Sequence, residues 1–349
     1  MRSKKVFVVT VVCFLFFIPR MGLSQTDFKK PKVILKMASN APEGMELTNY
    51  IKNEITIGGI ERVTDGEVTF SWYHGGVMGD DEDWIVKMDI DQLQGAGLDA
   101  SGVDIAVPEL GVMQLPFIFN DVDEIAYLRK TLRQRITTLF EDKGYKPLIL
   151  GEQPFDDIYS IKREIRTPGD FTKAKFAAYY SVVAKEALKA LGAGQIPISV
   201  PEIVSSMRAG ICDSLICPAL WYVGSQLYTI TYCVIPSNIR CTMGGIVITM
   251  KAWERIPEKH HESILEVMRE LEPGFTGPSS ILSNNNERCY KAMIKYGIKE
   301  LKLTPDELEV LKNKTRPVWD KLAGNVYPRE LLDTILGHLE EYRSDYPGM

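Results

Sequence analysis

Residues that bind metals or act as nucleophiles are scarce in this chain of 349 residues. It has only four histidines, His74, His260, His261 and His338, and none stands at metal-ligand spacing from a cysteine or an acid. No Gly-x-Ser-x-Gly turn and no motif-level Cys–His pair occurs either. The sequence therefore indicates neither a zinc site nor a nucleophilic hydrolase, and it predicts no cofactor.

Clusters of positive charge are also missing. Removing the first 24 residues takes away four basic residues and no acid, so the formal charge moves from −5 to −9, with 37 Lys and Arg against 46 Asp and Glu. An acidic chain without a basic cluster argues against nucleic acid and anionic lipid as partners.

The chain has one long hydrophobic run, from Val6 to Ile18, which is too short for a comfortable membrane span. Basic residues precede this run, and Gly22-Leu23-Ser24 follows it with small residues at a cleavage spacing. This pattern predicts a secretory signal peptide at residues 1–24. A retained membrane anchor is the alternative.

Five cysteines remain after residue 24, and an odd number leaves at least one free thiol in an exported protein. Cys233 and Cys241 flank an expected turn at Pro236-Ser237-Asn238, so these two are candidates for a disulfide. The alternative is that the cysteines are small buried hydrophobic residues.

The stretch from Lys173 to Tyr222 alternates short apolar segments with helical patterns. The strands are expected at Lys175–Tyr179, Gln195–Ser199 and Asp213–Cys217. Such alternation predicts a parallel sheet covered by helices on both faces. Ligands bind beyond the carboxyl ends of the strands in these sheets. The candidate rim therefore comprises Tyr179–Ser181, Val200–Pro201 and Cys217–Trp221.

A similar α/β pattern precedes this stretch, and its strands are expected at Val33–Ser39, Glu67–Tyr73, Val103–Val107 and Lys146–Leu150. Strands at Tyr228–Ile235 and Gly244–Met250 are expected to return the chain to the first unit, before a series of C-terminal helices. We therefore predict two α/β lobes joined by hinge strands. Lobe I comprises residues 25–152 plus about 243–282, and lobe II comprises 153–242 plus about 283–349.

Several segments in a characteristic order carry a family resemblance. They are Asn40-Ala41-Pro42-Glu43-Gly44, Val63-Thr64-Asp65-Gly66-Glu67, Met78-Gly79-Asp80-Asp81, Leu115-Pro116-Phe117-Ile118-Phe119, and two longer runs at 165–171 and 202–213. In these segments the chain resembles the solute-binding proteins of TRAP (tripartite ATP-independent periplasmic) transporters, of the dicarboxylate-binding subfamily. The resemblance implies a two-lobe Venus flytrap fold in the periplasm. It also implies capture of a small-molecule ligand in the cleft, delivery to membrane permease subunits, and no enzymatic activity.

The chain departs from this family where the family usually has two arginines for a ligand carboxylate. Ala177 and Asp156 stand at those positions. A buried carboxylate without its partner costs about 3–5 kcal/mol, or roughly two to four decades of affinity. We therefore predict an apolar or neutral ligand rather than a small carboxylate held in the usual way. The predicted ligand-binding residues are Asn40, Met78, Asp156, Ala177, Tyr179, Ser181, Ile216, Cys217, Trp221 and Met243.

Other interpretations stay open at this point. Asp156 and Asp157 could pair with a cationic ligand, and a shifted base such as Lys175 or Arg240 could restore the binding of an organic acid. Loss of both arginines also fits a branch of the family that works with a periplasmic tetratricopeptide-repeat helper protein. From other classes, the candidates are an exported α/β hydrolase or isomerase, and a scaffold or sensor that has lost ligand binding.

Overall fold

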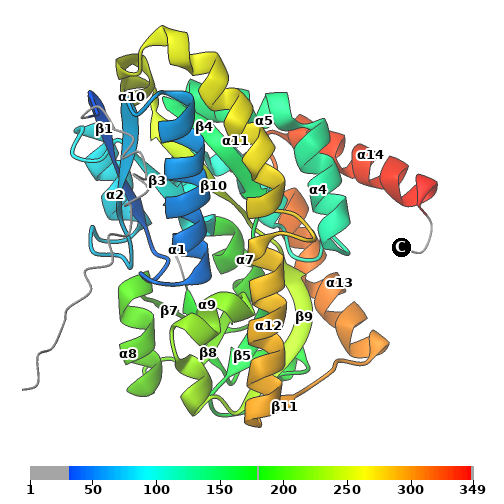
Figure 1. Cartoon of the computed structure of the whole chain (residues 1–349). Helices are drawn as coiled ribbons and strands as arrows, with labels where there is room; N and C mark the ends of the chain where they lie inside the picture. The colour runs from blue at the N-terminus through cyan, green and yellow to red at the C-terminus, as the bar shows by residue number, and fades with distance from the viewer. Residues whose placement is uncertain (1–30, 179–180, 347–349) are drawn as a thin grey trace, which may run out of the picture.

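The computed structural model describes residues 31–178 and 181–346. The predicted signal peptide and Tyr179 lie outside the described residues. The elements gather around two sheets, one above the other in Figure 1. This arrangement confirms the predicted α/β fold.

The first sheet has five strands in the order β2-β1-β3-β10-β4. The strands are β1 (Val33–Ser39), β2 (Val68–Tyr73), β3 (Gly95–Leu98), β4 (Tyr145–Glu152) and β10 (Met243–Thr249). Strand β1 runs parallel to β2 and β3, whereas β10 is antiparallel to both of its neighbours, β3 and β4. All seven residues of β10 are buried. A strand from the second half of the chain therefore lies inside the first sheet.

The third strand is not where the sequence predicts it. Val103–Val107 is not a strand, because Ala100–Ala106 forms helix α3, and β3 is the preceding segment Gly95–Leu98. Close packing explains the glycine at the start of β3, since a Cβ on Gly95 would overlap the carbonyl oxygen of Val247 in β10. Asp99 then ends the strand and caps α3, where its carboxylate accepts a hydrogen bond from the Ser101 amide at 2.9 Å.

Helices cover both faces of this sheet. They are α1 (Glu46–Tyr50), which continues as a π-helix at Ile51–Glu61, α2 (Asp81–Asp89), α3 (Ala100–Ala106), α4 (Val122–Thr131), α5 (Arg133–Asp142), α10 (Met250–Arg255) and α11 (His261–Phe275). A short 3-10 helix at Pro108–Gln114 follows α3, and another at Glu258–His260 precedes α11. Ile246 and Val247, successive residues of β10, belong to the two different hydrophobic clusters on the opposite faces.

The second sheet has six strands in the order β11-β9-β5-β8-β6-β7. The strands are β5 (Asp156–Ser160), β6 (Lys175–Ala178), β7 (Gly194–Pro197), β8 (Ser214–Cys217), β9 (Cys233–Arg240) and β11 (Lys299–Glu300). Strand β6 is parallel to β7 and β8, as the sequence predicts for this stretch. Strand β5 is antiparallel to both β8 and β9, so the sheet as a whole is mixed.

The prediction of a turn at Pro236-Ser237-Asn238 is wrong, because β9 runs straight through these residues. The strand expected at Tyr228–Ile235 begins later than predicted, since Leu227–Ile230 is a 3-10 helix. The ladder shifts register opposite Pro236-Ser237-Asn238, between Asp156 and Ile158 of β5, which accommodates a residue that has no amide hydrogen. Cys233 and Cys241 thus lie at opposite ends of a strand and do not bridge. All five cysteines in the described residues are free thiols.

The helices of the second sheet are α6 (Pro168–Phe171), α7 (Val182–Ala190), α8 (Ile203–Arg208), α9 (Ala219–Gly224) and α12 (Ile281–Tyr296), with a 3-10 turn at Val200–Glu202. Two further helices, α13 (Pro305–Leu322) and α14 (Arg329–Asp345), complete the chain. In Figure 1, α11 lies above α12 in the middle of the view, and the two lead from the upper sheet to the lower.

The chain passes between the sheets at 153–155, 241–242 and 276–280. Helix α14 returns to the first sheet, where Arg343 bonds Glu124 of α4 at 2.7 Å. Helix α13 contacts both parts of the molecule. Its Leu311 packs in a hydrophobic cluster of the second sheet, whereas Nε1 of Trp319, near the end of the helix, donates to the Pro116 carbonyl at 3.1 Å. The lobe boundaries at these crossings stay a proposal. None of the helices in the described ranges is long and apolar enough to span a membrane.

Candidate functional site

A cavity with a mainly apolar lining lies between the two sheets and has a volume of about 320 Å³. The first sheet and its loops supply one wall, and the loops and helices of the second sheet supply the other. We call this cavity the apolar chamber. Its apolar lining residues include Pro42, Met45, Leu47, Ile51, Leu98, Pro154, Val200, Pro201, Val204, Pro218, Leu220, Trp221, Ile246, Phe275 and Leu282.

A smaller cavity of about 90 Å³ adjoins the apolar chamber, and we call it the polar chamber. The two cavities share five lining residues, namely Asp99, Gln153, Val200, Pro218 and Trp221. The polar chamber adds Ser101, Asp156, Ser181, Arg240 and Thr242. Together the chambers form one cleft, with a wide part whose lining is mainly apolar and a narrow part whose lining includes Asp156 and Arg240.

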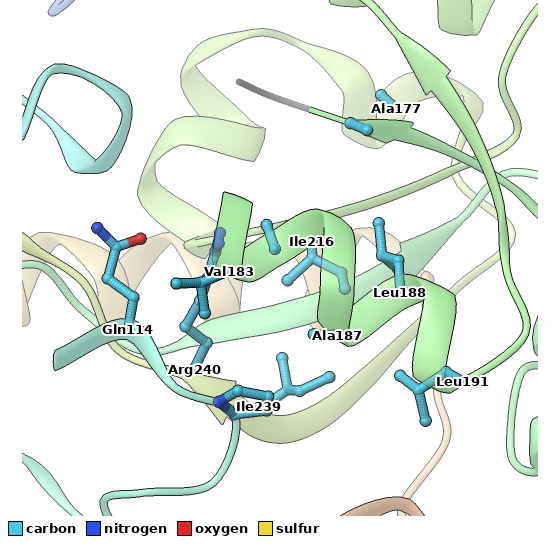
Figure 2. Close-up of a pocket in the computed structure, with 12 residues that line it drawn as sticks. Gln114, Ala177, Val183, Ala187, Leu188, Leu191, Ile216, Ile239 and Arg240 are labelled. Carbon is cyan, nitrogen blue, oxygen red and sulfur yellow. The ribbon is translucent and has the colours of Figure 1, made fainter. Parts of the chain in front are cut away.

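A third, narrow cavity of about 30 Å³ lies under the start of helix α7, and we call it the inner pocket. Figure 2 shows that Arg240 rises from its strand beside Val183, with Gln114 on the other side. Ile216 and Arg240 line both the inner pocket and the polar chamber. The Arg240 side chain therefore lies between the two cavities.

Arg240 forms a buried ion pair with Asp156. Its Nε and Nη2 atoms each lie 2.7 Å from Oδ2 of Asp156, and the two side chains are 10% and 2% exposed. Burial raises the pKa of Asp156, and the positive charge of Arg240 opposes this shift. The arginine charge in this part of the cleft is thus balanced by a carboxylate of the same chain.

A cluster of acidic groups lies at and behind the opposite, first-lobe wall of the cleft. Asn40 donates its Nδ2 to Asp81 Oδ2 at 3.1 Å and to Asp99 Oδ2 at 3.4 Å. Burial and the neighbouring charge of Asp99 raise the pKa of Asp81 well above its usual range. Asp99 is the member of this group that lines both chambers.

Asp104 of helix α3 lies behind this wall, where its Oδ1 accepts a hydrogen bond from Gln114 Nε2. Burial raises the pKa of Asp104 to about 6, against the opposing effects of Ser181 and Arg240. The native state therefore holds this proton more tightly than the unfolded chain does. Stability from this group is lost as the pH rises from about 4 to about 6.

We expect Asp104→Asn to remove this loss, because asparagine keeps the acceptor oxygen and cannot ionise. The variant should match wild type at pH 4 and exceed it by about 2–3 kcal/mol at pH 8, since each pKa unit corresponds to about 1.4 kcal/mol. Urea unfolding across this pH range measures the difference. Asp333→Asn, on the exposed face of α14, is the control and should show no such trend. A difference that does not vary with pH would contradict the prediction.

Most of the residues predicted from the sequence line these cavities. Asn40 lines the apolar chamber, Ala177 lines the inner pocket, and Trp221 lines both chambers. Asp156, Ser181, Ile216 and Cys217 line the polar chamber. Their contact with a ligand stays a prediction, as does that of Tyr179, which is outside the described residues.

Two predicted residues lie elsewhere. Met243 is buried at the start of β10, and Met78 packs partly buried against the same hydrophobic cluster, so neither lines the three cavities. Of the two candidate replacement bases, Lys175 is exposed at the far end of β6 from Ala178, whereas Arg240 lies in the cleft. Asp157, which the sequence offered as a partner for a cationic ligand, lines none of these cavities. Burial raises the pKa of Asp157 to about 7.

Three further cleft residues, Asp99, Gln153 and Thr242, are not predicted from the sequence. Asp99 is a helix N-cap after a strand, a signal that correct placement of β3 would have revealed. Gln153 and Thr242 lie on two crossings between the lobes, where the backbone N–H of Gln153 donates to the backbone carbonyl of Thr242 at 2.8 Å. No local pattern marks either residue.

The profile of the family described as bacterial extracellular solute-binding protein, family 7 (DctP), matches residues 58–325. The chain belongs to this family. Family 7 proteins are the periplasmic solute-binding components of TRAP transporters, so the resemblance to TRAP solute-binding proteins is confirmed. The dicarboxylate-binding subfamily stays a prediction.

Curated relatives of this family 7 protein are distant. It is 20% identical to a solute-binding protein of Chromohalobacter salexigens over 283 residues, which is 81% of each chain. It is 22% identical to a solute-binding protein of Verminephrobacter eiseniae over 183 residues, which is 52% of this chain and 53% of that protein.

Solved structures of TRAP periplasmic solute-binding proteins share the fold. One from Haemophilus influenzae with bound L-gulonate has a TM-score of 0.80 and 16% identity, and covers 89% of this chain and 99% of that one. One from Chromohalobacter salexigens with bound D-glucuronate has a TM-score of 0.78 and 17% identity, and covers 88% and 99%. The two-lobe fold predicted for the chain is thus confirmed.

Proposed function

We propose that this family 7 protein captures one small molecule between its lobes and delivers it to the membrane permease subunits of a TRAP transporter. Family membership and a cleft with walls from both lobes support this role. The family is periplasmic and consists of binding proteins rather than enzymes. The helper protein with tetratricopeptide repeats stays a prediction from the resemblance alone.

We propose further that the ligand is neutral, with an apolar body in the apolar chamber and hydrogen-bonding groups in the polar chamber. The observation that carries this proposal is the Arg240–Asp156 pair, because it leaves no net positive charge at the narrow end of the cleft. The apolar lining of the wide chamber supports it. A neutral solute can enter without displacing an existing ion pair.

An organic acid is the second candidate ligand. Arg240 lines the polar chamber, and the two solved relatives named above were crystallised with sugar acids bound. Binding in this mode would require the ligand carboxylate to take the place of Asp156 on Arg240, next to the charge of Asp99. The two candidates therefore differ in what remains bound to the purified protein.

Native mass spectrometry of the purified protein, followed by extraction and identification of the bound compound, tests the proposal. We expect a neutral compound that Trp221→Ala releases, with affinity about 10 to 100 times weaker, because a large apolar contact shared by both chambers is removed. Tyr296→Ala removes an aromatic ring that is 63% exposed and should leave binding unchanged. A tightly bound carboxylic acid in the wild-type protein would contradict the neutral-ligand proposal.

A further inference from the structure

We propose that Asp156 is a specificity-determining residue, an internal carboxylate that occupies Arg240 and so excludes free carboxylic acids from the cleft. This inference rests on the proposed function, in which the cleft is the ligand site. It assigns a role to Asp156 that differs from direct contact with the solute.

Sheet register fixes the pair. Asp156 begins β5 and lies opposite Arg240, which ends β9, in the antiparallel ladder that joins these two strands. Two N–H groups of the guanidinium converge on one carboxylate oxygen, with both distances at 2.7 Å. A free acid would use the same guanidinium N–H groups, with its two carboxylate oxygens as acceptors.

An acid from solution would have to compete with Asp156 for Arg240, and this competition favours Asp156. Asp156 is already held beside Arg240 by the backbone, so its contact with the guanidinium is intramolecular and has a high effective concentration. A free acid at micromolar or millimolar concentration must lose its own translational freedom to reach the same groups. The internal carboxylate therefore keeps its place on Arg240 when small acids are present.

The surrounding charges act in the same direction. Asp99 lines the polar chamber together with Asp156, and Asp104 lies behind the first-lobe wall against Gln114. An acid in this chamber would meet these carboxylates at close range, and like charges at close range disfavour binding. Ala177 of β6, which lines the inner pocket, contributes no charge to offset them.

The location of the pair distinguishes it from an ion pair that only supports the fold. Asp156 and Arg240 both line the polar chamber, and Arg240 also lines the inner pocket. The ion pairs of Arg129 with Glu152 and Glu272 are buried to a similar degree, but they line none of the three cavities. A charged pair placed at the cavity wall is in a position to decide which solutes enter.

The test is to remove the internal carboxylate and offer free ones. Asp156→Ala would be titrated with acetate, pyruvate and succinate by isothermal calorimetry, in parallel with the wild-type protein and with the double variant Asp156→Ala/Arg240→Met. We expect Asp156→Ala to bind at least one acid at least 100-fold more tightly than wild type does. The double variant should lose this gain, because the guanidinium that binds the acid is absent.

Asp156→Asn is a second variant, of nearly native shape, in case the alanine variant fails to fold. For each variant, circular dichroism checks the fold, and the rise in melting temperature with added acetate gives an independent measure of binding. A folded Asp156 variant that gains no acid binding would overturn the inference. A gain that survives loss of Arg240, or a wild-type protein that binds the acids as tightly as the variants, would overturn it as well.

These outcomes separate the inference from the proposed function. If the wild-type protein carries a neutral compound and the Asp156 variants gain no acid, the inference fails and the proposed ligand class stands. If the variants gain acid binding through Arg240 while the wild-type protein carries no neutral compound, the ligand class fails and the inference stands.

Discussion

Replacing Arg129 with methionine is expected to lower the free energy of unfolding by about 3–5 kcal/mol, the usual effect of leaving a buried charge without its partner. Arg129 bonds Glu152 at 2.8 Å and also pairs with Glu272, and these carboxylates are only 2% and 5% exposed. Glu272 keeps Arg133 at 2.6 Å after the substitution. Glu152 has no other ion pair among the described residues, so its charge would be left buried.

Arg135→Met is a matched control, because it removes the same side chain from the neighbouring helix α5. Arg135 pairs with Glu330 on the surface, where the two side chains are 41% and 66% exposed. An exposed pair contributes about 0–1 kcal/mol, so the control should lose at most that much. Urea unfolding with linear extrapolation measures both variants. Equal losses would show that the buried cluster has no special role in stability.

Gly245→Ala is expected to destabilise the protein by about 3 kcal/mol or more, through overpacking that the structure cannot relieve. An added Cβ would overlap the carbonyl oxygen of Ile149, which is backbone and cannot rotate away. Strand β10 is held between β3 and β4, so it cannot shift without breaking a ladder on one side. The same glycine lines the apolar chamber.

The same substitution at Gly337 should have the opposite sign. Gly337 lies inside helix α14, and nothing lies within 4 Å of the position of an added Cβ. Alanine in a helix interior is favoured over glycine by roughly 0.5–1 kcal/mol, so Gly337→Ala should stabilise the protein. Thermal and urea unfolding of the pair test whether backbone contact at Gly245 decides the outcome. A loss at Gly245 below about 1 kcal/mol would contradict this explanation.

The sequence predicted those elements whose residues carry a strong periodic pattern. The alternation between Lys175 and Cys217 gave three parallel strands in nearly the right places, and it located the rim that lines the cleft. The pattern failed at β3, because the segment Gly95–Leu98 contains no β-branched or aromatic residue. It also failed at β9, where Pro236 and Asn238 have the composition of a turn yet lie in a strand with a register shift.

Individual residues of the site could be predicted from the sequence, but the contacts between them could not. The sequence drew attention to Asp156 as an acid in place of an arginine, and to Arg240 as one of several possible bases. Their pairing depends on the ladder between β5 and β9, which joins residues that are 84 positions apart. Register between strands so distant in sequence is set by tertiary packing, and no local pattern reports it.

The place of β10 in the first sheet has a consequence for the order in which the chain can fold as it is made. Strands β3 and β4 flank β10, and each exposes an unpaired edge until residues 243–249 have been synthesised. The sheet of the amino-terminal lobe therefore cannot be completed until most of the second sheet has been made, and the nascent polypeptide stays incompletely folded until 249 of its 349 residues exist. Such late completion suits a protein whose family works on the far side of a membrane, because a chain must be unfolded to pass through a narrow export channel.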